Sequence, residues 1–186
     1  MKIFSIAILL LTISSGCSFE SKQLNAISAL LKSPDNEIPA PNWILYWYGN
    51  ENPIYAINNE ESIIFANDLN QVLVFKNNQI TRILGILPNG SEVRIEREND
   101  SLSYFENNIH IRTDECSFWY SSTKQSNILN RSVQNCFFEN TSSYQNTILF
   151  EYSGNEEKKI VGLKYKIHPK YPHVVIKMTN YLDEEF

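Results

Sequence analysis

The sequence predicts a mainly β protein, an antiparallel meander that forms a β-sandwich or an incomplete β-barrel, with one short N-terminal helix. Two observations predict this class. From residue 43 onward, short runs rich in Ile, Val, Phe and Tyr alternate with Asn, Asp, Gly and Pro, at spacings typical of antiparallel all-β domains. Asn-Asn pairs stand between neighbouring runs, and asparagine tolerates the positive φ angles that tight hairpin turns require.

The first residues have the pattern of a secretory signal peptide. Lys2 supplies the positive charge, residues 3–13 are predominantly apolar, and small residues follow directly before Cys17. The apolar run is shorter than the roughly 20 residues that span a membrane. Small residues before a cysteine resemble the lipobox of bacterial lipoproteins, although Ser14 stands where leucine is usual. The pattern predicts cleavage before Cys17 and lipidation of that cysteine, and the alternative is an ordinary secreted protein.

The predicted lipid determines the expected location. Ser18, rather than aspartate, follows the cysteine. By analogy with the usual sorting rule in Gram-negative bacteria, we expect the cell outer membrane, with the domain on the periplasmic side. Two or three acyl chains such as palmitate anchor a protein stably, because each buried methylene contributes about 0.8 kcal/mol. The domain then needs no membrane-binding surface of its own.

A short helix and a linker are expected after the lipid. In SKQLNAISALLK (residues 21–32) the apolar side chains recur at helical spacing, and Pro34 follows. Residues 33–42 contain further prolines and few apolar side chains, as is typical of an extended connection. We therefore divide the chain into a signal peptide (1–16), a lipidated cysteine with helix and linker (17–42), and a single β-rich domain (43–186).

The expected strands follow one another through short turns. Asn77-Asn78 joins VLVF to ITRILGI, Asn107-Asn108 joins SYFE to IHIR, and residues 153–155 join ILFEY to KKIVGLKYKI. Hairpins in succession form a meander. Residues 121–130 are polar, and we expect the longest loop there. The expected strands are 44–48, 54–57, 62–66, 72–75, 80–86, 92–97, 102–105, 109–112, 133–138, 147–152, 159–167 and 174–181.

Composition narrows the classes of partner. The formal net charge is −5 and the sequence pI is about 5.3. An acidic surface argues against binding nucleic acid and against electrostatic adhesion to anionic lipid. We expect the lipid anchor to be the only membrane contact.

Cys116 and Cys136 are the two cysteines that remain beside Cys17. An oxidising compartment permits a disulfide between them, and closing a loop of about 20 residues would stabilise the fold by roughly 3 kcal/mol. The other interpretation is that each is a buried small hydrophobic residue, which is common for free cysteine. Both interpretations stay open from the sequence. Neither cysteine has the sequence context of a catalytic thiol.

The chain carries no recognisable catalytic or cofactor motif. It lacks a G-x-S-x-G elbow, a Walker-type loop and H-E-x-x-H. His110 lies alone in an expected strand, while His168 and His173 flank a turn without further ligands at metal-site spacing. Glu60-Glu61 and Glu156-Glu157 lie at turns, where charge usually means solvation. We therefore expect no metal, no cofactor and no enzymatic activity.

Aromatic residues are dense at residues 43–48 and 117–120. Such side chains stack on sugar rings and also fill β cores. Alternation places Trp43, Leu45 and Trp47 on one face of the first strand. We favour core packing for both runs, because an exposed patch of that size is unusual without a partner.

Taken in order, these parts resemble the lipoproteins of the group 4 capsule and YjbF family (GfcB-like), which are associated with loci for exopolysaccharide or capsule secretion in Gram-negative bacteria. The likeness is diffuse but covers most of the mature chain: Cys17, the first strand at residues 38–48, VLVFKNNQITRILGI (72–86), CFFE (136–139), and the TILFEYSGNEEKKIVGLKYKI hairpin with YPHVVIKMTNYL. The family usually has Asn-Gly where this chain has Asn77-Asn78, and commonly tryptophan where it has Phe150. Its middle region is also shorter here.

The resemblance implies a role and no catalytic residues. That role is a non-enzymatic accessory factor in exopolysaccharide or capsule secretion, with other export proteins or the polysaccharide itself as partners. The alternatives are an incomplete β-barrel that carries an acyl chain or hydrophobic ligand in envelope trafficking, and an enzyme acting on cell-wall glycans. A deep apolar cavity would favour the carrier, and a filled core the accessory factor.

Overall fold

In the part of the chain that the computed structural model describes, thirteen strands form one antiparallel sheet. The structure describes residues 42–59, 61–122, 129–139, 142–152 and 158–186, all within the unit Ala40–Phe186. The strands are β1 (Trp43–Trp47), β2 (Asn50–Asn59), β3 (Ser62–Ala66), β4 (Val72–Lys76), β5 (Gln79–Leu84), β6 (Val93–Glu98), β7 (Ser101–Glu106), β8 (Ile109–Cys116), β9 (Tyr120–Ser122), β10 (Leu129–Phe138), β11 (Ser142–Tyr152), β12 (Lys158–Lys166) and β13 (His173–Met178).

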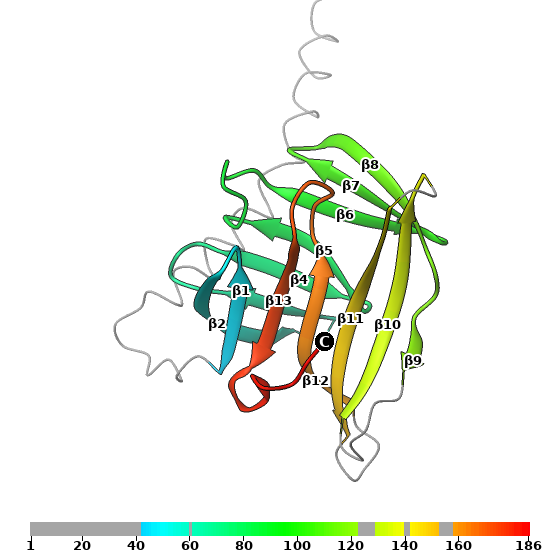
Figure 1. Cartoon of the computed structure of the whole chain (residues 1–186). Coiled ribbons are helices and arrows are strands. Elements are labelled where there is room, and N and C mark those ends of the chain that lie inside the picture. Colours follow the sequence, from blue (N-terminus) through cyan, green and yellow to red (C-terminus); the bar gives the residue numbers. More distant parts are fainter. Residues whose placement is uncertain (1–41, 60, 123–128, 140–141, 153–157) are drawn as a thin grey trace, which may run out of the picture. The chain divides into compact units, whose positions relative to one another are not determined.

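The sheet closes on itself. Neighbouring strands run in the order β11-β12-β13-β1-β2 and then in sequence to β8, which pairs with β10, and β10 pairs back to β11 (Figure 1). Twelve of the thirteen strands form this ring, and β9 pairs beside β8 on the same edge of β10. The prediction of a sandwich or an incomplete barrel is therefore wrong. Hairpin signals in a sequence specify only neighbours, whereas closure depends on the first and last strands, where Trp43 pairs with Met178.

Helical structure in the described part of the chain is limited to one short 3-10 turn, η1 (Thr179–Tyr181), where the sequence predicted the end of the last strand. The barrel thus has no α-helix in its described residues. The helix expected over residues 21–32 lies outside them, as do the signal peptide and Cys17. None of the described helices is long and apolar enough to cross a membrane.

The asparagine turns adopt the backbone that the sequence predicts. Asn77 and Asn78 have φ angles of 53° and 59°, and Asn107 and Asn108 have 49° and 67°. Positive φ at both central residues matches the right-handed twist of the flanking strands. The expected strand at 80–86 ends sooner, at Leu84, because Gly85 has φ +66° and approaches the backbone oxygen of Asn70 so closely that a Cβ would lie 2.3 Å from it.

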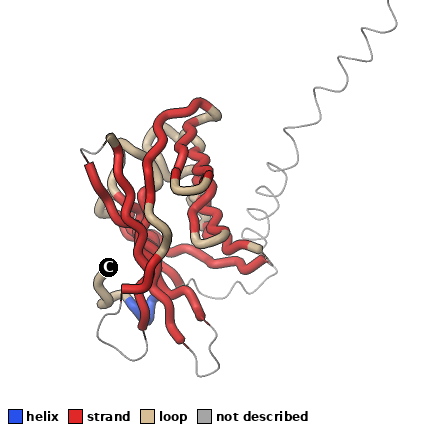
Figure 2. The backbone as a smooth tube through the Cα atoms, turned by 90° about the vertical axis from the view of Figure 1, so that its right-hand side faces the viewer, coloured by secondary structure: helices blue, strands red, loops and turns tan. Residues whose placement is uncertain are grey.

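Side chains fill the interior of the barrel. β1 alternates buried and half-buried residues, so Trp43, Leu45 and Trp47 point inward and the core prediction is confirmed for these three, whereas it is wrong for Tyr48, which is 56% exposed. One hydrophobic cluster contains buried residues from each of the twelve ring strands. Figure 2 shows strands on two sides of this core. The barrel encloses packed side chains of both walls, including the fully buried Tyr104 and Tyr165.

Two junctions in the ring are short. β5 and β6 pair through Arg82 with Arg94 and Ile83 with Val93, and β8 and β10 pair through Cys116 with Cys136 and Glu115 with Phe137. By contrast, β10 and β11 pair along their whole length. We call the β8–β10 junction the seam, because it joins the chain's middle to its C-terminal strands.

Candidate functional site

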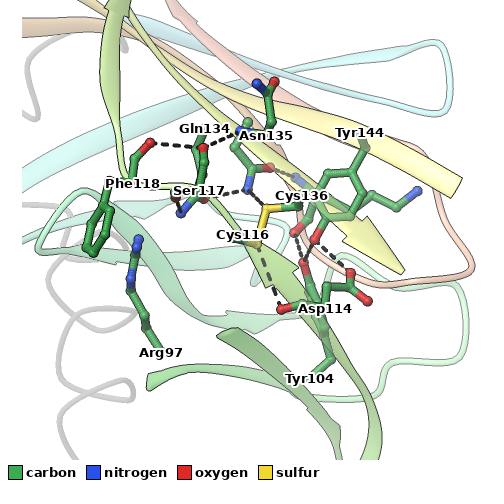
Figure 3. The surroundings of a disulfide bond; sticks show 12 residues. Arg97, Tyr104, Asp114, Cys116, Ser117, Phe118, Gln134, Asn135, Cys136 and Tyr144 are labelled. Atoms are coloured by element: carbon green, nitrogen blue, oxygen red, sulfur yellow. Dashed lines mark hydrogen bonds between the residues drawn. A yellow bond between two sulfur atoms is a disulfide. The ribbon is translucent and has the colours of Figure 1, made fainter. Parts of the chain in front are cut away.

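A disulfide closes the seam. Cys116 and Cys136 lie directly opposite each other, and their sulfur atoms are 2.10 Å apart (Figure 3). Both residues are buried, at 4% and 0% exposure. With two residue pairs between the strands, backbone hydrogen bonding alone gives the seam little strength, and the covalent bond supplies a link that the short ladder does not.

Ser117 extends this link by one residue. Its backbone N–H donates to the carbonyl of Asn135 at 2.8 Å, and its hydroxyl accepts the backbone N–H of Asn135 at 3.0 Å. The carbonyl of Ser117 accepts a bond from the side-chain amide of Gln134 at 3.2 Å. The end of β8 is therefore fixed to β10 by hydrogen bonds as well as by the disulfide.

A buried ion pair lies on the inner side of the seam. Asp114 is fully buried, and the Arg112 guanidinium contacts both of its carboxylate oxygens, at 2.6 Å and 2.7 Å. The Arg112 guanidinium also lies over the ring of Phe138, 4.4 Å from its centroid, within the roughly 6 Å over which a cation is attracted to an aromatic face. The hydrogen bond from Arg112 Nη2 to Asp114 Oδ2, together with the close Nε contact, offsets part of the cost of burying the two charges.

Two tyrosines complete the ion-pair cluster. Tyr144 donates to Asp114 at 2.8 Å, since a carboxylate can only accept. The Tyr104 hydroxyl lies 2.7 Å from that of Tyr144 and 3.3 Å from the carbonyl of Lys166, so its own proton is directed to one of these oxygens. Burial raises the pKa of both tyrosines, and the neighbouring Asp114 charge raises them further. Both phenols are neutral hydrogen-bond donors at physiological pH.

Two buried amides carry the polar network across to β12. The side chain of Asn146 donates to Gln134 at 3.1 Å and accepts the backbone N–H of Lys166 at 2.8 Å. Asn146 and Gln134 are both fully buried. Figure 3 shows Asp114 and Tyr144 on one side of the disulfide, with Ser117, Gln134 and Asn135 on the other. The disulfide thus lies within a continuous set of polar contacts that joins β7, β8, β10, β11 and β12.

Sequence reasoning missed this cluster. One signal was available: Asp114 stands two residues before Cys116, so alternation places the carboxylate on the same face as the buried cysteine. Its partners Tyr104 and Tyr144 come from strands that are distant in sequence. No local pattern indicates that they meet.

The outer side of the seam exposes aromatic rings. Tyr120 is 46% exposed and Phe137 45%, and Phe118, beside the seam, is 72% exposed. Between the first two, Gln145 donates its side-chain amide to Asn135 at 3.0 Å, and Asn135 donates to the Tyr120 hydroxyl at 2.8 Å. We call Tyr120, Asn135, Phe137 and Gln145 the seam face.

Core packing was the wrong prediction for two of the aromatic residues at 117–120. Phe118 and Tyr120 are exposed, whereas the half-buried Trp119 packs against the core. The reason is local: β8 ends at Cys116 and β9 begins at Tyr120, so the simple alternation of a continuous strand is interrupted there. β9 itself falls in the region where a long loop was expected, and residues 123–128 lie outside the described part.

The histidines that flank the β12–β13 turn have different partners. His168 is buried, and its Nε2 lies 3.4 Å from Glu106. Burial lowers the pKa of His168, and hydrogen bonds from Asn89 and Ser91 lower that of Glu106. Burial, aided by the charges of Lys166 and Lys164, lowers the pKa of His173 to about 4.

The remaining sequence-based candidates are dispersed. His110 bonds to the neighbouring Thr113 hydroxyl at 2.9 Å, and Glu61 forms an exposed ion pair with Lys76. Among the described residues, no group of three or more His, Cys, Asp or Glu side chains is arranged to hold a metal ion. Glu60 and residues 156–157 lie outside the described part of the chain.

A second aromatic cluster lies at the β1–β2 turn. Tyr48, which is 56% exposed and has φ +51°, contacts the rings of Trp47 and Tyr171 edge-on at 5.0 Å and 6.2 Å. Tyr171 also lies 4.8 Å from the His168 ring. This cluster provides a matched comparison for the seam face, because it too exposes a tyrosine.

No protein family model matches the chain, and no curated protein sequence matches it. Among solved structures, the chain is similar to the hypothetical lipoprotein YmcC from Escherichia coli K12, with 11% identity and a TM-score of 0.49, over 82% of this chain and 92% of that one. A likeness this distant transfers no function.

Proposed function

We propose that the protein is an outer-membrane lipoprotein, anchored through Cys17, that acts by contact as a non-enzymatic accessory factor in the secretion or assembly of a surface polysaccharide. The signal-peptide pattern supports the anchor, and the resemblance to the group 4 capsule and YjbF family supports the pathway. The observation that carries the mode of action is the contrast across the seam, where the inner side is filled and the outer side exposes aromatic rings.

The filled interior favours contact over carriage of a hydrophobic ligand. A carrier needs internal volume for its cargo, and such sites bury most of the ligand. Here one hydrophobic cluster draws buried side chains from all twelve ring strands. Large rings such as Phe65, Tyr104 and Tyr165 occupy the space between the walls and are at most 1% exposed.

The outer face favours a binding partner. Isolated exposed apolar residues are normal, but aromatic residues that lie together on one rigid face are enriched where proteins bind partners. Tyr120 and Phe137 share such a face, and the disulfide at Cys136 lies directly between Asn135 and Phe137 in sequence. The partner is an export protein or the polysaccharide, and the membrane is contacted through the lipid alone.

The experiment compares a deletion strain with strains that carry the wild type or Cys17→Ser. We expect the deletion to lower the amount of surface polysaccharide and the wild-type gene to restore it. Cys17→Ser protein should leave the membrane pellet after a salt wash, because the acyl chains are its only anchor. Unchanged polysaccharide in the deletion strain would refute the pathway, and a pelleted Cys17→Ser protein would refute the anchor.

The non-enzymatic mode has its own test. Glu92, Glu96 and Glu139 are described carboxylates on or beside strands, and Glu106 has a histidine partner. Replacing each singly with glutamine should lower secretion only modestly, because scattered surface charges contribute little binding energy. If one variant abolished secretion while folded and correctly localised, a catalytic carboxylate would be the better account.

A further inference from the structure

We propose that the seam face, formed by Tyr120, Asn135, Phe137 and Gln145, binds a neutral carbohydrate chain. This assigns a ligand class and a site to the contact surface, and it rests on the proposed function for the source of the glycan.

The four side chains share one face of the sheet. Asn135 and Phe137 are two residues apart on β10, and Val133 on the same side of that strand pairs with Tyr120. Gln145 pairs with Asn135 from β11. The intervening residues Gln134 and Cys136 are buried, so Asn135 and Phe137 point away from the core, whereas Val133, beside Tyr120 on the same face, is covered at 2% exposure.

The seam face forms a strip along β10, with Tyr120 and Phe137 at its two end positions. Tyr120 stands opposite Val133, four positions from Phe137 along β10. At about 3.3 Å per residue, the two aromatic positions are roughly 13 Å apart along the strand. The Tyr120 hydroxyl reaches the Asn135 side chain at 2.8 Å, so the two aromatic residues and the amides between them form one continuous surface. A surface of this length exceeds one pyranose ring and fits a chain of several sugar units better than a monosaccharide.

The groups between the rings match carbohydrate chemistry. Aromatic faces pack against the C–H faces of sugars, and carboxamides bond to hydroxyls as both donors and acceptors. The side-chain amide of Gln145 donates to Asn135, and that of Asn135 donates to the Tyr120 hydroxyl. Each amide therefore uses one N–H in this ladder of side-chain hydrogen bonds and keeps the other for a ligand. The ladder fixes the orientation of both amides, which lowers the entropy that a ligand must overcome.

Charge selects a neutral ligand. Among the residues paired directly opposite the strip on this face, Val133 and Ser143 are uncharged and Glu115, opposite Phe137, is acidic. The four side chains of the seam face thus carry no positive charge that would pair with a polyanion such as an acidic polysaccharide or a nucleic acid. The acidic balance of the whole chain acts in the same direction.

The seam holds this strip rigid. Cys136 lies between Asn135 and Phe137 and is bonded to Cys116, while Ser117 binds the backbone of Asn135 on both its N–H and its carbonyl. A binding strip whose backbone is fixed loses little freedom when a ligand docks. The disulfide and the Ser117 hydrogen bonds therefore hold the backbone of the binding surface in place on the outside of the barrel.

The experiment is affinity electrophoresis of the detergent-extracted, lipidated protein through gels that contain surface polysaccharide from the same cells. The polysaccharide is first separated by anion exchange into neutral and acidic fractions. We expect the neutral fraction to retard the wild type. Tyr120→Ser and Phe137→Ser should each weaken apparent binding about tenfold, because aromatic side chains carry much of the binding energy at such surfaces. Phe137→Trp, which keeps a ring, should retain binding.

Tyr48→Asn is the matched control, because it removes an exposed aromatic side chain far from the strip at a positive φ that asparagine tolerates. It should bind as the wild type does. Retardation by the acidic fraction alone, equal retardation of wild type and both serine variants, or no retardation would each overturn the glycan site. A wild type that is dimeric and a Phe137→Ser variant that is monomeric would also overturn the glycan site, because the strip would then be a contact between two copies of the chain. If the glycan test fails while gene deletion still lowers surface polysaccharide, the site is refuted and the proposed function stands.

Discussion

The barrel is held together differently on its two sides. In β1 to β5, the fully buried inward side chains are apolar, such as Leu45, Ile54, Phe65, Leu73 and Ile83. Near the seam, Asp114, Gln134 and Asn146 are just as deeply buried and are polar, and each has a side-chain or backbone partner. The first region gains stability from area removed from water, and the second from directional contacts around a disulfide.

This difference has consequences for how each region responds to substitution. An apolar core tolerates exchange between side chains of similar volume. A buried polar network loses far more when one partner is removed, because the other partner keeps its charge or its unsatisfied bond. The seam is therefore the region where single changes have the most specific effects.

Removing Asp114 should have the largest effect. Asp114→Ala leaves the Arg112 charge without its partner and the Tyr144 hydroxyl without its acceptor, so we expect a loss of about 3–5 kcal/mol in the free energy of unfolding. The double replacement Arg112→Met with Asp114→Leu removes both charges and should recover much of this loss. Urea unfolding of both variants measures the difference. If the double replacement is as unstable as Asp114→Ala, the loss does not come from an unpaired Arg112 charge. The contrast drawn between the polar seam and the apolar region would then be wrong.

The disulfide should be next. Replacing both Cys116 and Cys136 with alanine frees a loop with a sequence separation of 20, which is expected to cost about 3 kcal/mol. Urea unfolding of the variant, beside the wild type with and without reductant, measures it. A double-alanine variant as stable as the wild type would mean that the short β8–β10 ladder and Ser117 are sufficient to hold the seam.

Acid should weaken the barrel through His173 by a smaller amount. Its pKa falls from about 6.5 in the unfolded chain to about 4 in the fold because burial disfavours the charged ring. Between these values the unfolded state binds a proton that the native state does not, so stability decreases as the pH falls from 6.5 to 4. After allowance for partial solvent exposure, we expect roughly 1–2 kcal/mol from this residue.

His173→Gln tests this directly, because glutamine does not titrate. Unfolding free energies at pH 6.5 and pH 4 should show a smaller decrease for the variant than for the wild type. The difference between the two decreases isolates His173 from His168, whose pKa burial also lowers. Parallel decreases in both proteins would contradict a buried, neutral His173.

The smallest effect should come from an exposed ion pair. Arg94 and Glu96 lie 3.1 Å apart on β6, with side chains 44% and 53% exposed. Glu96→Gln should change the free energy of unfolding by about 0.5 kcal/mol or less, because solvent screens the pair. Thermal unfolding of Glu96→Gln and of Asp114→Ala, each beside the wild type, measures the difference between the exposed and the buried ion pair. A loss as large as that of Asp114→Ala would show that burial does not separate the two kinds of pair.

The sequence predicted the apolar region well and the seam poorly, for a physical reason. Alternation identified Trp43, Leu45 and Trp47 as core, and the paired asparagines at 77–78 and 107–108 identified turns, because both signals depend on neighbouring residues. Closure depends on β1 meeting β13, and the ion-pair cluster depends on Tyr104 and Tyr144 meeting Asp114 from distant strands. No short pattern encodes those meetings.

We propose that the protein acts through the outside of the seam. The most direct measurement is the amount of surface polysaccharide in deletion cells that carry the double variant Tyr120→Ser with Phe137→Ser, beside cells that carry the control Tyr48→Asn, with each protein present at wild-type level in the membrane. We predict that the seam variant leaves polysaccharide near the level of the deletion strain, while the control restores it. Full restoration by the seam variant would contradict the claim.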